Sequence, residues 1–258
     1  MGAGDQINNP GWDSLDAISA AVVTCTKCRL NETRTRAVPG DGSPFPSVLF
    51  VGEGPGANED EQGLPFVGRA GSLLDALLDL VPLRRQDVYI TNVVKCRPPG
   101  NRDPMPDEVT ACWPYLEAQL ALLEPRVIAT LGRHSLGRFF PGARISEMHG
   151  RPVAWREGIV LLPLYHPAAG LRSTKLRTAL EEDIQKIPDA IIMALDSARA
   201  IRPAAAGSES SLPSLGPNSS VADGMETDNL TDAPGVASSP GESSTEQKNA
   251  DDGQITLF

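Results

Sequence analysis

The chain has 258 residues and a formal net charge of −10 at pH 7, and its composition changes abruptly near residue 203. Residues 203–258 hold nine acidic side chains and one basic, so the rest of the chain is nearly neutral and can present a basic face to nucleic acid. The sequence has no apolar stretch of roughly 18 residues and no recognisable signal peptide, so we expect a cytoplasmic protein without a membrane segment.

Along residues 1–202, short apolar runs typical of buried strands alternate with segments in which apolar residues recur at helical spacing. In chain order, the pattern predicts a helix first and then strand and helix in turn, at residues 14–23, 48–52, 72–81, 87–94, 107–123, 126–131, 133–140, 158–164 and 174–200. This alternation favours an α/β fold with a mostly parallel sheet and helices on both faces. We expect one folded domain, 1–202, and a disordered tail, 203–258, in which Ser, Pro, Gly and acidic residues dominate.

The first predicted strand runs directly into the sequence Gly52-Glu53-Gly54-Pro55-Gly56. Three glycines at alternate positions leave the backbone bare, so a ligand can approach it closely. An acidic turn at residues 58–61 follows, and the next helix is expected to start near Gly68. Open α/β sheets bind their ligands at the carboxyl ends of strands, so we expect a ligand pocket at this loop.

The four cysteines form two pairs, Cys25 with Cys28 and Cys96 with Cys112. A C-x2-C pair on a tight turn can point two thiolates at one metal, and the second pair could complete a cage of four sulfur atoms. Such a cage suits zinc or a [4Fe–4S] cluster, and the spacing does not separate the two. The alternative is four reduced thiols, some of them buried as small apolar side chains.

Several separated motifs occur together in a specific order: GEGPG, PFVGRAG, YITNVVKCRPPGNRDP, the cysteine pairs and YHPAA. Together they resemble the family 4 uracil-DNA glycosylases, over about residues 25–180. The resemblance implies a three-layer α/β/α fold with a central four-stranded sheet. It also implies a largely structural [4Fe–4S] cluster on the four cysteines, and excision of uracil, flipped out of DNA, by hydrolysis of its N-glycosidic bond.

The resemblance implies roles for three of the side chains. His166 would hydrogen-bond the uracil, where a donor aimed at O2 stabilises the charge of the leaving group. The Asn92 amide offers one donor and one acceptor, which match uracil O4 and N3–H and mismatch cytosine. Phe66 would stack on the flipped base.

Other residues near these motifs have less definite roles. The backbone at Gly54 would contact uracil, and Asn101 resembles a further polar residue of the family's active site. Glu53 and Glu59 are the nearest carboxylates, and one of them could position the attacking water, while Glu59 could also disfavour thymine. We expect His134 and His149 to be surface or loop residues.

DNA contact is expected from basic side chains near strand ends, namely Lys95, Arg97, Arg102, Arg133, Arg138, Arg172, Lys175 and Arg177. Leu171 resembles the residue that enters the minor groove as a wedge. The basic insert with a histidine, by which the related family X enzymes trap DNA covalently, is absent from residues 97–102. We therefore expect hydrolysis without a stable covalent adduct. We also expect the enzyme to be a monomer.

The chain ends in QITLF, an apolar segment after a long acidic tract. It resembles the pentapeptide by which bacterial repair proteins bind the replication sliding clamp, with Gln254, Leu257 and Phe258 as the binding residues. The alternative is a chance apolar terminus. A flexible tract of about 50 residues spans about 40 Å, enough to tether an enzyme to a clamp.

Two other classes of function compete with a glycosylase. The sequence Gly52-x-Gly54-x-x-Ala57 loosely fits the fingerprint of a nucleotide-binding Rossmann-like protein. A non-catalytic zinc module that binds nucleic acid or the clamp would use the cysteines. Both alternatives predict that the protein releases no uracil.

Overall fold

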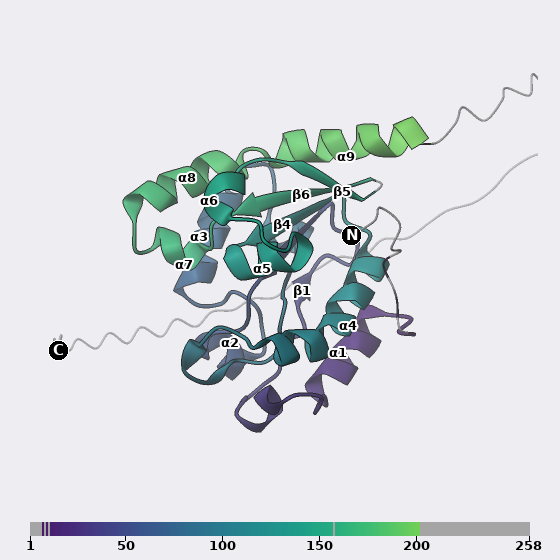
Figure 1. Cartoon of the computed structure of the whole chain (residues 1–258), viewed down its shortest axis with the longest axis vertical. Helices are drawn as coiled ribbons and strands as arrows, with labels where there is room; N and C mark the ends of the chain where they lie inside the picture. Colours follow the sequence, from purple (N-terminus) through teal and green to yellow (C-terminus); the bar gives the residue numbers. More distant parts are fainter. Residues whose placement is uncertain (1–6, 8, 10, 157, 202–258) are drawn as a thin grey trace, which may run out of the picture. The chain divides into compact units, whose positions relative to one another are not determined.

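The computed structural model describes residues 7, 9, 11–156 and 158–201, and these form an α/β domain around a single sheet (Figure 1). The predicted disordered tail and the predicted clamp-binding residues, Gln254, Leu257 and Phe258, lie outside the described residues. Within the described part of the chain, no helix has the length and apolar character needed to cross a bilayer.

The sheet has six strands in the order β1-β3-β2-β4-β6-β5. Their bounds are β1 (Asp41–Gly42), β2 (Val48–Gly52), β3 (Tyr89–Asn92), β4 (Val127–Leu131), β5 (Val153–Arg156) and β6 (Ile159–Leu164). The four central strands are parallel, with Leu49 of β2 opposite Tyr89 of β3 on one side and Ile128 of β4 on the other. The expected parallel core of four strands is confirmed.

The two edge strands, β1 and β5, pair antiparallel with β3 and β6, and the sequence analysis missed both. Strand β1 is only two residues long and exposed, and no residue of β5 is fully buried. Short edge strands carry little of the apolar signal on which the prediction relied.

The helices match the predicted alternation, with shifts at their ends and a few additions. Their bounds are α1 (Leu15–Val23), α2 (Ala57–Gln62), α3 (Arg69–Leu78), α4 (Pro106–Leu123), α5 (Arg133–Phe139), α6 (Ile145–Met148), α7 (Pro167–Gly170), α8 (Thr174–Ile184) and α9 (Ile187–Ile201). Three short 3-10 helices are η1 (Arg29–Glu32), η2 (Arg85–Asp87) and η3 (Pro99–Asn101). The predicted acidic turn at residues 58–61 is wrong, because these residues form helix α2.

Two apolar cores hold the three layers together. Val48 and Phe50 of β2 face one side, where α3, α8 and α9 pack, and the alternate residues Leu49 and Val51 face α1 and α4 on the other side (Figure 1). Since β2 is buried on both faces, its sequence is a continuous apolar run rather than an alternating one. This arrangement confirms the three-layer α/β/α fold.

Candidate active site

A large pocket opens at the carboxyl ends of the four parallel strands. The loops after β2, β3, β4 and β6 all contribute side chains to it. The structure brings the predicted base-binding residues together in its lining: Glu53, Gly54, Glu59, Phe66, Asn92, Asn101 and His166. Parallel strands end at the same edge, so motifs more than 100 positions apart in the chain meet there.

The loop that carries Phe66 is held in an unusual conformation. Phe66 has a φ of 52°, in the left-handed region that non-glycine residues seldom adopt. A side chain at Gly71 would collide with the Phe66 carbonyl, and one at Gly52 would collide with the Phe66 ring and the Asn92 amide. The glycines therefore let Phe66 and Asn92 approach the end of β2 closely.

Glu59 fixes this loop and its carboxylate has no oxygen left without a partner. One oxygen accepts hydrogen bonds from the backbone N–H groups of Val67 and Gly68, at 3.0 and 2.9 Å, and the other accepts from Gly56 N–H at 3.1 Å. A carboxylate that accepts three backbone bonds is a positioning group. These bonds tie Glu59 to the backbone of its own loop, which makes it a weaker candidate than Glu53 for orienting the attacking water.

Asn92 is the last residue of β3, and its side chain is only 1% exposed. Its amide oxygen, Oδ1, has no hydrogen-bond partner within the described part of the protein. Leaving a buried acceptor unpaired costs about 1–3 kcal/mol, so native proteins seldom do it without a reason. Because Asn92 lines the pocket, a ligand with an N–H group at this point would satisfy the oxygen.

His166 is the N-cap of α7, and its ring is fixed in one tautomer. Its Nδ1 accepts a hydrogen bond from Ala168 N–H at 3.1 Å, so a neutral ring carries its proton on Nε2. Burial, together with the nearby positive charge of Arg172, lowers the pKa of His166 to about 4. At pH 7 His166 is therefore a neutral hydrogen-bond donor, packed beside the Phe66 ring with 5.7 Å between the ring centroids.

The four cysteines line one smaller cavity, beside α1, η1 and α4. None forms a disulfide, and three of the sulfur atoms accept N–H hydrogen bonds: Cys25 from Lys27 N–H, Cys96 from Arg34 and Cys112 from Lys95 N–H. Burial raises the pKa of the Cys112 thiol to about 12 and also raises that of Cys28 and Cys96. A metal would have to displace these protons on binding.

The sulfur atoms are spaced too widely for one small ion. Among the described residues, the one group of three or more possible ligands with atoms all within 4.8 Å of one another is Glu53, Asp103 and His134, so no three of the sulfur atoms are that close. Four thiolates on a single zinc at ~2.3 Å would lie about 3.8 Å apart. The spacing of the sulfur atoms therefore suits a group with several metal atoms better than it suits a single zinc ion.

Comparison with known proteins identifies the family to which the chain belongs. The sequence model of the Uracil DNA glycosylase superfamily matches residues 39–198. The chain belongs to this superfamily. It is 48% identical over 189 residues to the type-4 uracil-DNA glycosylase of Sulfurisphaera tokodaii, a match that covers 70% of this chain and 86% of that protein.

Two further relatives show the breadth of the superfamily. The type-4 uracil-DNA glycosylase of Thermotoga maritima is 46% identical over 176 residues, covering 67% of this chain and 92% of that protein. The type-5 uracil-DNA glycosylase of Thermus thermophilus is 38% identical over 151 residues, covering 51% of this chain and 68% of that protein.

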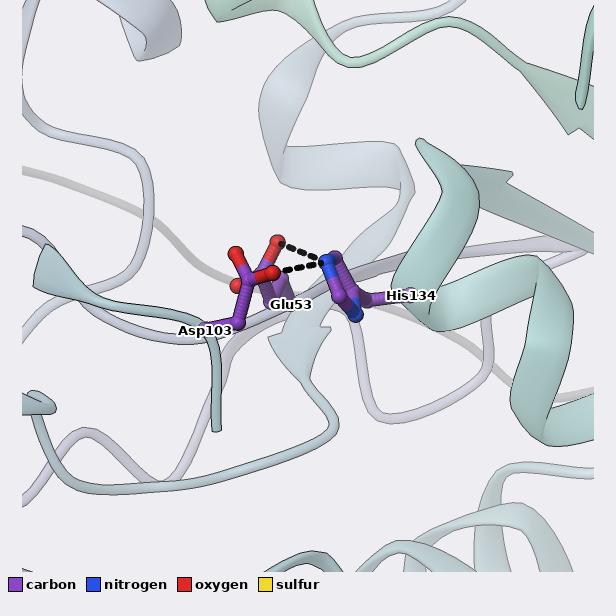
Figure 2. A group of neighbouring side chains, drawn as sticks. All are labelled: Glu53, Asp103 and His134. Carbon is purple, nitrogen blue, oxygen red and sulfur yellow. Dashed lines mark ion pairs between the residues drawn. The ribbon is translucent and has the colours of Figure 1, made fainter. Parts of the chain in front are cut away.

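His134 lines the same pocket, although the sequence analysis expected a surface or loop residue. It is the second residue of α5, and its Nε2 lies 3.1 Å from Asp103 Oδ2 and 3.9 Å from Glu53 Oε2 (Figure 2). Its position in the sequence could have revealed it as a pocket residue, because His134 follows the end of β4 as His166 follows the end of β6. His149 does lie in a turn, but it is half-buried, with its Nδ1 2.7 Å from Asp183 Oδ2.

The expected DNA-contacting residues separate into two groups. Arg102, Arg133 and Arg172 line the pocket, although Arg102 also pairs with the buried Glu108 at 2.7 Å. Leu171 follows α7 and is 39% exposed. Arg97 donates a hydrogen bond to Asn101 Oδ1 at 2.7 Å, while Lys175 and Arg177 lie on α8 outside the lining.

The prediction for Lys95 is wrong. Its side chain is 1% exposed, and its ammonium donates to the Asn92 carbonyl, the Thr91 hydroxyl and the Gln119 amide oxygen. Arg138 also differs, because its guanidinium carbon lies 3.8 Å from the centroid of the Trp113 ring and the residue does not line the pocket. Sequence position near a strand end did not reveal that these two cations point into the protein.

Proposed function

We propose that this protein is a type-4 uracil-DNA glycosylase, which takes a uracil flipped out of DNA into its pocket and hydrolyses the N-glycosidic bond. Membership of the superfamily supports this proposal, and so do the relatives of that name. The observation that carries it is the unpaired, buried Asn92 Oδ1 in a pocket that also holds a neutral histidine donor. The non-catalytic alternatives explain neither feature.

Recognition would rest on Asn92 and Phe66. Uracil N3–H can donate to Asn92 Oδ1, whereas cytosine presents an unprotonated N3 at the same place and would leave the oxygen unpaired. The Phe66 ring offers a flat apolar surface for the base. Reading of the Watson–Crick edge by a buried amide requires the base to leave the duplex first.

Bond cleavage would rest on His166. As the C1′–N1 bond breaks, its electron pair moves onto uracil, and negative charge develops on O2. The Nε2–H of neutral His166 can donate to that oxygen, and a donor of this kind is worth about 10²–10³ in rate. Since the pKa of His166 is about 4, the ring is neutral at pH 7. It would therefore stabilise the negative charge on O2 by donating a hydrogen bond, not by carrying a positive charge.

Hydrolysis would rest on Glu53. Water adds its oxygen to C1′ of the cationic sugar and loses a proton, and the uracil anion takes up a proton from solvent. Three carboxylates line the pocket, and Glu59 is held by three backbone N–H groups while Asp103 pairs with Arg133, so we assign Glu53 to orient this water. The negative carboxylate would also stabilise the positive sugar.

We further propose that the four cysteines hold a [4Fe–4S] cluster. The single cavity, the wide spacing of the sulfur atoms and the N–H donors to three of them support this proposal. When bound, the cluster supplies a structural link between the segment after α1, the loop after β3 and helix α4. The residues that hold it would be Cys25, Cys28, Cys96 and Cys112.

Contacts with partners are a separate proposal. Arg97, Arg102 and Arg172 would contact DNA phosphates around the pocket, and Leu171 would enter the base stack. The terminal residues Gln254, Leu257 and Phe258 would bind a replication sliding clamp, which rests on their sequence alone.

The function is tested by release of uracil from an oligonucleotide with a single uracil, read as strand cleavage at the abasic site in hot alkali. We expect wild type to cleave, and His166→Ala and Asn92→Ala each to lose at least about 100-fold in single-turnover rate. Arg84→Ala is the control. This exposed residue precedes β3, so it lies near the amino-terminal ends of the strands, opposite the end that carries the pocket.

The outcomes separate the activity from the residue roles. If purified wild type releases no uracil from single- or double-stranded DNA, the proposed function is wrong. If wild type releases uracil and both variants match the control, the function stands but the roles of His166 and Asn92 do not.

A further inference from the structure

Three segments that are distant in sequence meet at one side of the pocket. Glu53 follows β2, Asp103 lies between η3 and α4, and His134 is in the first turn of α5. Figure 2 shows the His134 ring turned toward both carboxylates, with the same nitrogen, Nε2, facing each of them. Among the described residues, His134 is the one basic side chain within 4.0 Å of the Glu53 carboxylate.

Two carboxylates and a histidine could together bind a metal ion, but here the Arg133 guanidinium already contacts two of the three side chains. Arg133 donates from Nε to His134 Nε2 at 2.9 Å and from Nη2 to Asp103 Oδ2 at 2.8 Å. The nitrogen and the oxygen that would bind a metal thus face a guanidinium instead. The cluster is a network of ion pairs and hydrogen bonds, and its chemistry depends on protonation.

His134 Nε2 can meet its neighbours in two ways. A neutral ring with its proton on Nδ1 accepts the hydrogen bond from Arg133. A protonated ring has no lone pair on Nε2, so it gives up the bond from Arg133 Nε, donates from Nε2 to Asp103 and presents positive charge to Glu53. Asp103 therefore orients the imidazolium, and His134 joins Asp103 to Glu53.

Glu53 needs such a partner. It is half-buried, and burial raises the pKa of its carboxyl, which His134 and Arg133 lower and Asp103 raises. The pocket also holds other charged groups, namely Glu59, Arg102 and Arg172, together with the neutral His166. Only an ionised Glu53 can orient water and face a cationic sugar.

We propose that His134, oriented by Asp103, is a positioning residue for hydrolysis, which holds the Glu53 carboxylate ionised and in place at the pocket. This inference rests on the proposed function, because it assigns a task within the same reaction. His134 does not need to touch the substrate. Its effect passes through the 3.9 Å contact with Glu53.

The test is the pH dependence of the single-turnover rate of uracil excision, measured with the full chain from about pH 5 to about pH 9. In His134→Ala, the Glu53 carboxyl keeps its burial and its repulsion from Asp103 but loses the imidazolium. The acid limb of the profile should therefore move up by about one pH unit. A shift of one pH unit slows the reaction by at most about tenfold, which is reached at pH values below the acid limbs of both proteins, and by less than about threefold near pH 9.

A second variant separates charge from orientation. His134→Gln keeps an N–H donor at this position but cannot become positive. It should restore the rate near pH 9 and retain the shifted acid limb. Glu53→Gln should remove the acid limb altogether and lower the rate most at high pH, where the Glu53 carboxylate of wild type is ionised.

Two results would overturn the inference. One is a His134→Ala profile parallel to that of wild type, which would mean a purely structural role. The other is an acid limb that persists in Glu53→Gln, which would mean that another group titrates. Both results are distinct from failure of the proposed function, in which wild type itself releases no uracil.

Discussion

The side chains of the pocket divide into those that would face the base and those that hold them there. Asn92 Oδ1 and His166 Nε2 form no hydrogen bond within the described residues and can therefore bind a ligand. Both oxygen atoms of Glu59, by contrast, accept hydrogen bonds from backbone N–H groups. Lys95 belongs with Glu59, since its buried ammonium supports the Asn92 carbonyl. Residues of this second kind affect activity through geometry rather than contact.

Glu59→Gln provides a test at the residue scale. One end of the new amide would be an NH2 group facing a backbone N–H, so at least one of the three hydrogen bonds would be lost. We expect a loss of about 1–3 kcal/mol in unfolding free energy, and a slower excision because Phe66 and the glycine loop shift. Denaturant unfolding and single-turnover kinetics measure the two effects.

Glu61→Gln is the matched control, because Glu61 is an exposed carboxylate on the same helix, α2. It should behave as wild type in both assays. Equal effects of the two substitutions would contradict the assignment of Glu59 as the residue that holds the loop.

At the scale of elements, α7 joins His166, the proposed hydrogen-bond donor to uracil, to Leu171, the predicted DNA wedge. This four-residue helix begins after His166, its N-cap, and ends before Leu171, its C-cap. A side chain at Gly170 would press on Leu180 of α8 and Leu73 of α3, so the helix is packed tightly against both. A wedge at its end is thus held at a fixed distance from the pocket.

Leu171→Ala tests this arrangement. Flipping a base out of a duplex requires unstacking, which costs a few kcal/mol, whereas a single strand has already lost most of that stacking. We therefore expect the variant to slow excision from double-stranded DNA by roughly tenfold or more, and from single-stranded DNA by less than about twofold. Parallel assays on the two substrates measure the difference.

Leu80→Ala serves as the control for lost apolar surface, because Leu80 is 50% exposed and follows α3, away from the pocket lining. If Leu171→Ala slows both substrates equally, Leu171 supports the pocket and is not a wedge.

At the scale of the whole molecule, the cysteine cavity and the uracil pocket are connected through one short segment. Asn92 ends β3, Lys95 follows in the same loop, and Cys96 comes next. The Lys95 backbone N–H donates to Cys112 Sγ at 3.2 Å, which links this loop to α4. Disorder at the cysteines should therefore reach the Asn92 amide.

Removal of the proposed cluster tests this connection. We expect the purified protein to contain iron and to absorb near ~400 nm, and oxidation followed by chelation to abolish that absorbance. The melting temperature should fall by at least about 10 °C, because the free energy of binding a structural metal group is part of the free energy of folding. Iron analysis and a thermal scan measure these effects.

Chelation without the oxidant is the control, and it should leave both the absorbance and the melting temperature unchanged. A colourless protein that contains zinc would contradict the cluster, and an unchanged melting temperature after loss of iron would contradict its structural role.

The amino-acid sequence by itself determined the α/β class, the four parallel strands and part of the pocket lining. Apolar runs report burial directly, and the carboxyl ends of parallel strands share one edge, so Glu53, Asn92 and His166 could be placed together without coordinates. The two edge strands escaped because they are short and exposed.

Only the tertiary structure decided how individual polar side chains are used. Lys95 and Arg97 stand two positions apart in the chain, yet one is buried beneath Asn92 and the other pairs with Asn101. Glu59 changed from a possible catalytic residue to a positioning one, and His134 moved from the surface into the pocket. The physical reason is that hydrogen bonds and ion pairs depend on contacts within about 3–4 Å, which sequence spacing does not specify.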